Sequence, residues 1–308
     1  MTTLSDLSRE FGDRVDRTDF TILAAHTIGK PKEYVFREPG HVLSGTEETA
    51  LRESLRRRSS REPVAYIVGE KEFFGLPFEV TRDTLVPRPE TEHLVEEALS
   101  LLSGTDSDTT VIDIGTGSGA IIVPIAKTIG TTVAKTIGTT VAKTIDEPKK
   151  ISFFATDFST GALEVARRNA KRHDVGHRIV FLEGNLLDPV PEDAFDSDRI
   201  IFLANLPYLS EEIYSSADRD VRDYEPRSAL VAQDDGLALY LRLLDDIARR
   251  KHDSWPDMRI NGLFEIGPEQ RDRISSEFER RFPNDEHSII DDLSGRPRIF
   301  RFRISPER

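Results

Sequence analysis

The segment Asn205-Leu206-Pro207-Tyr208 brings together residue types that can hold a planar NH2 group. It follows the apolar run Arg199 to Leu203, so a parallel strand is predicted to end just before it. The Asn205 side-chain oxygen can accept one hydrogen bond, and the Leu206 carbonyl, held extended by Pro207, can accept a second. Tyr208 offers a flat face to an amide or a base. We interpret all four as substrate-binding residues, and Asn205, Pro207 and Tyr208 as the catalytic ones.

A second candidate site is the glycine-rich run from Asp113 to Gly119, between an apolar run and an apolar helix start. Alternate glycines let a backbone turn tightly and approach a ligand without a Cβ in the way. Phosphate-binding and nicotinamide-binding folds use similar loops, and a plain tight turn is the simpler alternative. The predicted ligand-binding residues are Gly115, Thr116, Gly117, Ser118 and Gly119.

Asp157 follows the apolar run Ile151 to Ala155, where a carboxylate can accept hydrogen bonds from both hydroxyls of a ribose. Such an acid usually lies about 20 residues beyond the glycine loop. Here Gly119 and Asp157 are 38 positions apart, but the octamer of residues 126–133 recurs in residues 134–141. Without these 16 residues the separation is 22, which strengthens the assignment of Asp157. A helix N-cap is its alternative role.

Apolar runs and amphipathic stretches alternate from Thr110 onward, which indicates how these residues are positioned. The runs that predict strands are Val111–Ile114, Ile151–Ala155, Ile179–Leu182, Arg199–Ala204 and Leu263–Ile266. Ile299–Ile304 alternates apolar and charged residues, which predicts a half-buried closing strand. The stretches that predict helices are Ser159–Arg172, Asp235–Lys251 and Gln270–Phe282. Continuous apolar strands separated by helices are typical of a Rossmann-like α/β fold, with a mostly parallel sheet and ligands at the carboxyl ends of its strands.

The first 60 residues are predicted to be helical, with a strong helix from Glu47 to Arg58 that Thr46 could cap. The segment Lys71 to Val80 contains three phenylalanines around Gly75 and predicts a β-hairpin. The sequence therefore predicts a small helical domain and a β connector ahead of the α/β domain.

The composition argues against several other functions. The 308 residues carry a formal net charge of −13, which disfavours direct binding to nucleic acid through bulk electrostatics. There is no cysteine, and the seven histidines are scattered, so no metal site is expected. The N-terminus lacks a basic-then-apolar signal pattern, and no apolar run reaches the roughly 18 residues of a membrane span. We expect a cytoplasmic protein without a membrane partner.

Taken together, the glycine loop and the Asn205–Tyr208 segment resemble class I S-adenosylmethionine-dependent methyltransferases that methylate amino groups. The segment Leu85–Glu92 is similar to the signature of the release-factor glutamine methyltransferases, the PrmC/HemK family. The other matching segments are Glu225–Leu230, Asp235–Leu237, Glu265–Gly267 with Gln270, and Asp292–Arg296. The resemblance extends from about Pro63 to the C-terminus, and the helical N-terminal part fits the family's substrate-binding domain.

This resemblance implies S-adenosyl-L-methionine as the cofactor, bound by Gly115 through Gly119, Asp157 and Asn205. Leu186 aligns where relatives often carry a tryptophan near the adenine, and Leu206 stands where the family usually has proline. The implied substrate is the glutamine of the Gly-Gly-Gln motif in peptide-chain release factors, which are therefore the expected partners.

The resemblance also implies a division of the chain into three parts. Residues 1–70 are predicted to be an N-terminal helical substrate-recognition domain. Residues 71–88 are predicted to be a β-hairpin connector, and residues 89–308 the catalytic domain that binds S-adenosylmethionine.

Three alternatives remain open from the sequence. Adenine presents the same planar NH2 group, so an N6-adenine methyltransferase acting on nucleic acid could use a similar motif. A relative could methylate a glutamine of a ribosomal protein instead. The chain could also bind S-adenosylmethionine without catalysis, although intact Asn205, Pro207 and Tyr208 disfavour this.

Overall fold

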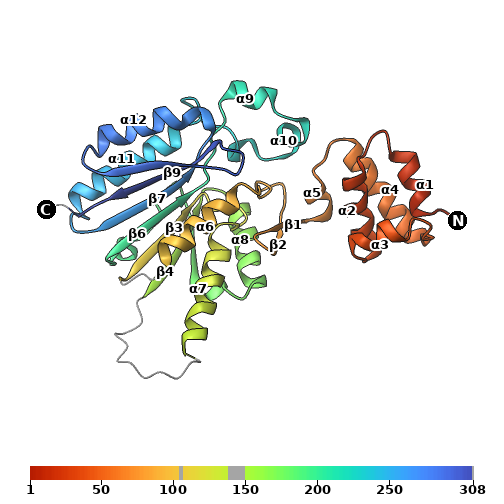
Figure 1. Ribbon diagram of the computed structural model, residues 1–308, viewed down its shortest axis with the longest axis horizontal. Helices are drawn as coiled ribbons and strands as arrows, with labels where there is room; N and C mark the ends of the chain where they lie inside the picture. The colour runs from red at the N-terminus through yellow and green to blue at the C-terminus, as the bar shows by residue number, and fades with distance from the viewer. Residues whose placement is uncertain (104–106, 138–149, 307–308) are drawn as a thin grey trace.

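The computed structural model describes residues 1–103, 107–137 and 150–306 and shows a mixed α/β molecule (Figure 1). Its central seven-stranded sheet has the order β5-β4-β3-β6-β7-β9-β8. The strands are β3 (Thr109–Ile114), β4 (Ile151–Asp157), β5 (Ile179–Glu183), β6 (Arg199–Ala204), β7 (Arg259–Glu265), β8 (Glu286–Asp291) and β9 (Pro297–Ile304). The first five are parallel, and β9 is antiparallel to both of its neighbours. The predicted mostly parallel sheet is confirmed.

Successive strand residues point to opposite faces of the sheet, which builds two apolar layers. One layer contains Ile112 and packs against α11 (Ala238–Asp253) and α12 (Arg271–Arg281). The other contains Val111 and packs against α6 (Thr91–Leu102) and α7 (Ile122–Ile137), and it also includes Ala170 of α8 (Thr160–Arg172). Burial on both faces explains why these strands are continuous apolar runs in the sequence.

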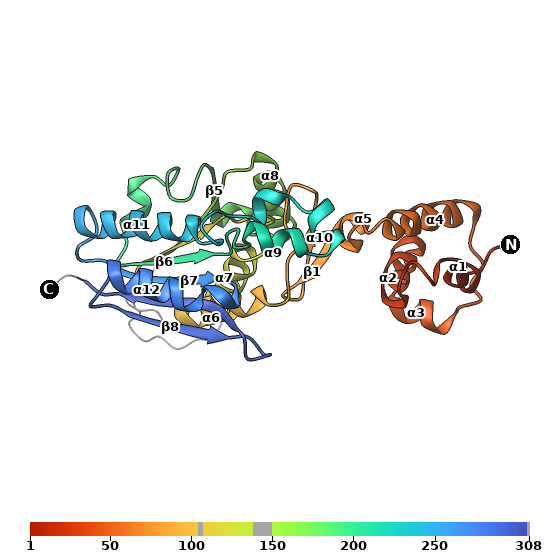
Figure 2. The same ribbon diagram turned by 90° about the horizontal axis from the view of Figure 1, so that it is seen from above.

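The N-terminal helices lie at one end of the elongated molecule, away from the sheet (Figures 1 and 2). They are α1 (Leu4–Phe11), α2 (Arg17–Ile28), α3 (Lys32–Arg37), α4 (Gly45–Ser59) and α5 (Val64–Val68). The first four enclose an apolar cluster of their own, which includes Leu7, Leu23 and Leu51. The predicted hairpin follows as β1 (Glu70–Phe73) and β2 (Leu76–Glu79).

The cap of α4 differs from the prediction. Ser44, and not Thr46, is the N-cap: its side chain accepts a hydrogen bond from the Glu47 N–H, and the Glu47 carboxylate accepts one from the Ser44 N–H. This reciprocal pair requires a spacing of three residues, which Ser44 and Glu47 have.

The C-terminal half contains elements that the sequence did not predict. The edge strand β8 is one of them, and α9 (Glu211–Ser216) and α10 (Arg219–Tyr224) follow β6. Short 3-10 turns lie at Gly176–Arg178, Glu192–Phe195, Arg227–Ala229 and Pro268–Gln270. The helix predicted from Asp235 begins only at Ala238, because Asp234, Asp235 and Gly236 have left-handed backbones with φ of 57°, 52° and 82°.

Only part of the octamer repeat falls within the described residues. Helix α7 continues to Ile137, so the first octamer is helical, and residues 138–149 lie outside the described part. Across the described ranges, no helix combines the length and apolar character that crossing a membrane requires.

Candidate active site

The glycine loop turns directly beside the Asn205–Tyr208 segment. It leaves the end of β3, which lies next to β6 in the sheet, so both segments emerge at the same edge. Gly115 has φ of 71°, a left-handed conformation, and a Cβ built on it would lie 2.8 Å from Leu206 Cδ2. Only glycine both adopts this left-handed conformation readily and leaves room for the Leu206 side chain to approach so closely.

Asp157 at the end of β4 joins the glycine loop to the start of α8. Its carboxylate accepts hydrogen bonds from the Gly117 N–H and the Ser159 N–H, each at 2.9 Å. Ser159, and not Asp157, is the N-cap of α8. Burial raises the pKa of Asp157, and the backbone hydrogen bonds oppose that rise. The carboxylate is thereby fixed in direction at the margin of the cavity.

The backbone of the Asn205–Tyr208 segment is anchored from the neighbouring elements. The Leu206 N–H donates to the Tyr240 hydroxyl at 3.0 Å, and that hydroxyl donates to the Glu265 carbonyl. The Gln270 side chain donates to the Tyr208 carbonyl at 2.9 Å. These partners come from α11, β7 and the turn before α12, so three elements set the path of the segment.

Gly236 is required by the same anchoring. A Cβ at this position would lie 1.9 Å from the Tyr208 carbonyl oxygen and 2.6 Å from Gln270 Nε2. The Asp235–Leu237 segment therefore packs closely against the Asn205–Tyr208 segment and supports it, a contact that its sequence position did not suggest.

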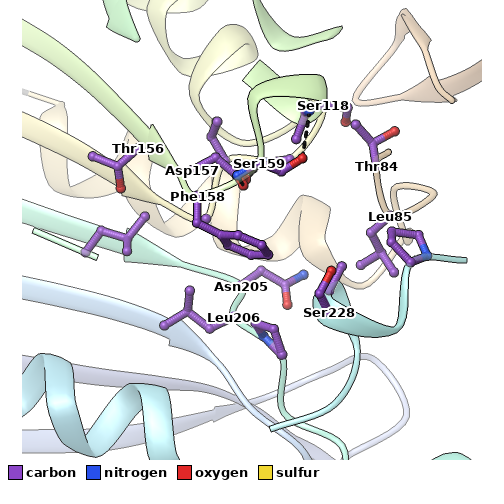
Figure 3. Close-up of a pocket in the computed structure, with 18 of the residues that line it drawn as sticks. Thr84, Leu85, Ser118, Thr156, Asp157, Phe158, Ser159, Asn205, Leu206 and Ser228 are labelled. Atoms are coloured by element: carbon purple, nitrogen blue, oxygen red, sulfur yellow. Dashed lines mark hydrogen bonds between the residues drawn. The ribbon is translucent and has the colours of Figure 1, made fainter. Parts of the chain in front are cut away.

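The Asn205 side chain extends from the end of β6 into a cavity, where its amide lies near Phe158 and Ser228 (Figure 3). Its Nδ2 donates to Thr91 Oγ1 at 3.2 Å. With Nδ2 facing Thr91, the side-chain oxygen is the group that Asn205 can present to a ligand.

Most of the predicted site residues line this one cavity: Gly115, Thr116, Gly117, Ser118, Asp157, Leu186, Asn205, Leu206 and Pro207. Two predicted residues do not. Gly119 faces Val123 and Ala166, where it permits close packing of the loop on α8. Tyr208 does not line the cavity; it is half-buried and packs on the apolar layer beneath α11. Burial raises the pKa of Tyr208 to about 12.

Leu186, which follows β5, lies in the cavity wall. Its backbone is left-handed, with φ of 51°, and its side chain is buried in the apolar layer that α11 covers. The neighbouring Asn185 also lines the cavity.

Phe158 is a cavity residue that the sequence analysis missed. Its side chain is 58% exposed, and Figure 3 shows the ring projecting from the end of β4 into the cavity. The signal available in the sequence was a large apolar residue directly after an acid at a strand end, where a polar turn residue is usual.

Leu85–Glu92 and Glu225–Leu230, two of the segments that carry the resemblance, both contribute to the cavity wall. Leu85, Pro87, Arg88 and Thr91 from the first segment, and Pro226, Ser228 and Ala229 from the second, all line it. The guanidinium of Arg88 pairs with the buried carboxylate of Glu225 at 2.5 Å and ties the two segments together. Burial raises the pKa of Glu225, and the charge of Arg88 opposes that rise.

Another buried carboxyl, that of Asp113, lies next to the glycine loop. Asp113 is fully buried and accepts a hydrogen bond from the Thr116 hydroxyl at 2.6 Å. Burial raises the pKa of Asp113 to about 7. The hydrogen bond fixes Thr116 and with it the first turn of the loop.

Two family profiles match parts of the chain. A family profile described as the PrmC N-terminal domain matches residues 4–69, and one described as a methyltransferase domain matches residues 105–219. A ribosomal protein L11 methylase from Lactobacillus delbrueckii subsp. bulgaricus has 17% identity and a TM-score of 0.41, over 72% of this chain and 81% of that chain. That structural likeness is too weak to inform the function.

The curated relatives are much closer in sequence. The release factor glutamine methyltransferase of Rhodopirellula baltica is 34% identical over 96% of this chain and 92% of its own length. Its counterpart in Nitratidesulfovibrio vulgaris is 37% identical over 76% of this chain and 74% of its own length. The counterpart in Aliivibrio fischeri is 31% identical over 94% of this chain and 90% of its own length. The resemblance inferred from the motifs is confirmed: this methyltransferase belongs to the release factor glutamine methyltransferase family.

Proposed function

We propose that the protein transfers a methyl group from S-adenosyl-L-methionine to the side-chain amide nitrogen of a glutamine, the Gly-Gly-Gln glutamine of peptide-chain release factors. The observation that carries this proposal is Asn205, whose amide faces the cavity beside the Leu206 backbone. The names of the curated relatives support glutamine and release factors as the substrate.

The cavity fits S-adenosylmethionine in its chemistry. One side has the glycine turn and the Asp157 carboxylate, whose oxygens suit the ribose hydroxyls of the cofactor. The apolar side chains of Phe158 and Leu186 suit the flat faces of adenine. When bound, the cofactor supplies an electrophilic methyl group on a sulfonium sulfur.

The residues of the chain would then orient the amide nitrogen. An amide nitrogen is a poor nucleophile because its lone pair is delocalised into the carbonyl. Asn205 Oδ1 and the Leu206 carbonyl can each accept one of the two amide hydrogens, which fixes the plane of the amide. Correct orientation of two reacting groups can lower a barrier by as much as about 7–11 kcal/mol. As the new N–C bond forms, the methyl carbon would leave the sulfonium sulfur, which becomes a neutral thioether, and the amide nitrogen would release one proton to water. We assign catalysis to the positioning of the amide.

The remaining predicted residues receive roles on the same basis. Gly115 through Gly119 and Asp157 would hold the cofactor, with Leu186 beside its adenine. Pro207 would keep the Leu206 carbonyl in place, and Tyr208 would support the segment from behind the cavity, where Gln270 holds its carbonyl.

The domain division is proposed to serve substrate recognition. Residues 1–70 would bind a surface of the release factor away from the reacting glutamine. Residues 71–88 would connect this domain to the catalytic domain, and residues 89–308 would bind the cofactor and perform the transfer. The separate apolar core of the N-terminal helices supports an independent unit there.

Methylation of a purified release factor, read by mass spectrometry, tests the proposal. We expect one added methyl group on the Gly-Gly-Gln glutamine and none on a release factor in which that glutamine is replaced by alanine. An adenine-containing oligonucleotide and a ribosomal protein fraction serve as competing substrates. Methyl transfer to either of these, with an unmodified release factor, would refute the proposed substrate.

A further inference from the structure

The buried side chain of Asn169, in α8, makes hydrogen bonds to two separate segments, strand β2 and the glycine loop. We propose that Asn169 is a positioning residue for the cofactor: its amide ties the glycine loop to β2 and so holds the loop in the conformation that binds S-adenosylmethionine. The inference rests on the proposed function, because it concerns how the cavity holds the cofactor.

Both ends of the Asn169 side-chain amide take part in these contacts. Its Nδ2 donates to the Ser118 carbonyl at 2.9 Å and to the Glu79 carbonyl at 3.0 Å. Its Oδ1 accepts from the Glu79 N–H at 2.7 Å. Because an NH2 group has two hydrogens, it can reach both segments at once. A carboxylate of the same shape could accept from the Glu79 N–H, but it could donate to neither carbonyl.

The burial of Asn169 indicates a role beyond packing. Its side chain is 0% exposed, and the other buried residues of α8, a helix that the structure describes completely, are apolar. A buried amide costs stability unless its donors and acceptors are paired, so an apolar residue would serve better if packing alone were required. Asn169 instead satisfies backbone groups of Ser118 and Glu79 that an apolar side chain would leave without these bonds.

The bond to Ser118 supports the glycine loop between two other contacts. On one side, the Gly117 N–H donates to the Asp157 carboxylate. On the other side, a Cβ built on Gly119 would lie 3.4 Å from the Cβ of Ala166 in α8. Asn169 holds the residue between them through its carbonyl. Because Ser118 itself lines the cavity, a shift of its peptide would change the shape of the cofactor site.

The bonds to Glu79 connect Asn169 with a second part of the cavity lining. Glu79 ends β2, and the segment that follows it lines the cavity at Asp83, Thr84 and Leu85. A Cβ built on Gly161, in the first turn of α8, would lie 2.8 Å from Asp83 Cγ, so this segment also packs on α8. Asn169 therefore joins two parts of one cavity lining to the same helix.

His173, the residue that follows α8, provides a matched comparison. It is buried, and its Nε2 donates to the Pro77 carbonyl of β2 at 2.9 Å. Its ring also packs against that of Phe78, with the ring centres 5.4 Å apart. Within the described part of the chain, its side chain makes no hydrogen bond to the glycine loop. Asn169 and His173 thus both hold β2, and they differ in the contact with the loop.

Leucine substitutions at these two positions test the inference. Either one removes a link to β2 and leaves an apolar side chain in its place, but only Asn169→Leu also removes the bond to Ser118. We expect Asn169→Leu to weaken S-adenosylmethionine binding by about 10-fold or more in calorimetric titration, the scale of a lost hydrogen bond that leaves a buried carbonyl unpaired. His173→Leu should bind the cofactor within about twofold of the parent. Thermal unfolding shows whether each variant is folded at the temperature of the titration.

Steady-state kinetics provide a result that a loss of stability alone would not produce. The KM for the cofactor should rise by about 10-fold in Asn169→Leu, the factor expected for its affinity. The kcat for release factor methylation should change by less than about threefold, because Asn169 lies outside the cavity lining that the described residues form.

Hydrogen exchange of the parent carries the test if Asn169→Leu does not fold. The Glu79 N–H can exchange only after its bond to Asn169 opens. Bound cofactor stabilises the glycine loop, so a loop joined to β2 through Asn169 should slow exchange at Glu79 by about 10-fold when the cofactor is saturating. The Phe74 N–H, which donates to the Glu92 carboxylate, should exchange at the same rate with and without cofactor.

The outcomes distinguish this inference from the proposed function. A parent that does not bind S-adenosylmethionine refutes the proposed cofactor and with it the proposed function. A parent that binds it, together with a folded Asn169→Leu that is weakened no more than His173→Leu, refutes the positioning role. Equal effects of the cofactor on hydrogen exchange at Glu79 and Phe74 also refute that role.

Discussion

At the scale of single residues, the structure changes what we expect of Asp157. The sequence indicated a ligand for ribose, and the structure adds that Asp157 also holds the Gly117 and Ser159 N–H groups. We predict that Asp157→Ala weakens S-adenosylmethionine binding by about 1–3 kcal/mol, the cost of losing hydrogen bonds to a charged group. Calorimetric titration measures this, with Asp188→Ala on the exposed surface as the matched control. Unchanged affinity in a folded Asp157→Ala would refute the assignment.

Leu206 is a residue at which sequence and structure lead to different expectations. Leu206 precedes Pro207 and is already restricted to extended backbone, so proline, the usual residue of the family, should be tolerated. The structure shows that the Leu206 N–H donates to Tyr240, and proline has no N–H to donate.

We therefore predict that Leu206→Pro destabilises the fold by about 1 kcal/mol but leaves turnover within about threefold of the parent, because the carbonyl is kept. Thermal unfolding and single-turnover methylation measure the two effects. A folded but inactive variant would mean that the leucine side chain, and not the backbone, holds the substrate.

At the scale of elements, the octamer repeat offers a clear test. Ile125, Ala126 and Ile129 contribute to the apolar layer under α7. Deleting residues 126–141 would place Ala142 to Ile145, the same four residue types as Ala126 to Ile129, directly after Ile125. The buried positions would be refilled, and five residues would remain before β4, a usual length for such a connection.

We therefore predict that this deletion leaves cofactor affinity and methylation within about threefold of the parent, because the buried positions are refilled and a shorter connection changes little in chain entropy. Deleting residues 122–129 instead removes buried side chains and serves as the destabilising control. Loss of cofactor binding in a folded 126–141 deletion would show that the repeat has a role in the site.

The strands of the sheet were predictable because burial on both faces leaves an uninterrupted apolar run, as in β3 and β6. The edge strand β8 was not predictable, because the exposed Glu286 and the half-exposed His287 prevent a continuous apolar run. Helices α9 and α10 have six residues each, too few for a periodic apolar face.

Residues of the candidate site could be predicted only where neighbouring residues in the sequence determine the conformation of the backbone. The glycine loop and the Asn205–Tyr208 segment carry that information in neighbouring residues. Thr91 contacts Asn205 from a position 114 residues earlier in the chain, and no local pattern predicts such a contact.

At the scale of the whole molecule, polar contacts between described residues join the N-terminal helices to the segment after β6. The Tyr224 hydroxyl donates a hydrogen bond to the Ser60 carbonyl at 2.8 Å. The guanidinium of Arg58 lies 3.7 Å from the carboxylate of Asp220. If the helical part binds the release factor outside its glutamine, these contacts set its position relative to the cavity without affecting the transfer itself.

We predict that Tyr224→Phe raises the KM for the release factor by about 2–10-fold and leaves kcat unchanged, which corresponds to one lost hydrogen bond. Steady-state methylation measures both parameters. Tyr214→Phe is the control, because that hydroxyl donates to the Arg222 carbonyl within the same segment. Equal effects of the two substitutions would contradict a role for the Tyr224 contact in placing the N-terminal helices.

In the proposed mechanism, Asn205 holds the glutamine amide for methyl transfer. Single-turnover methylation of a release factor with saturating cofactor, comparing Asn205→Ala with the parent, tests it most directly. Asn185→Ala, which removes another asparagine of the same cavity, is the matched control. We predict that Asn205→Ala slows the transfer by about 100-fold or more, as is typical when one positioning group is lost, and that Asn185→Ala does not. An Asn205→Ala variant that methylates as fast as the parent would contradict the account.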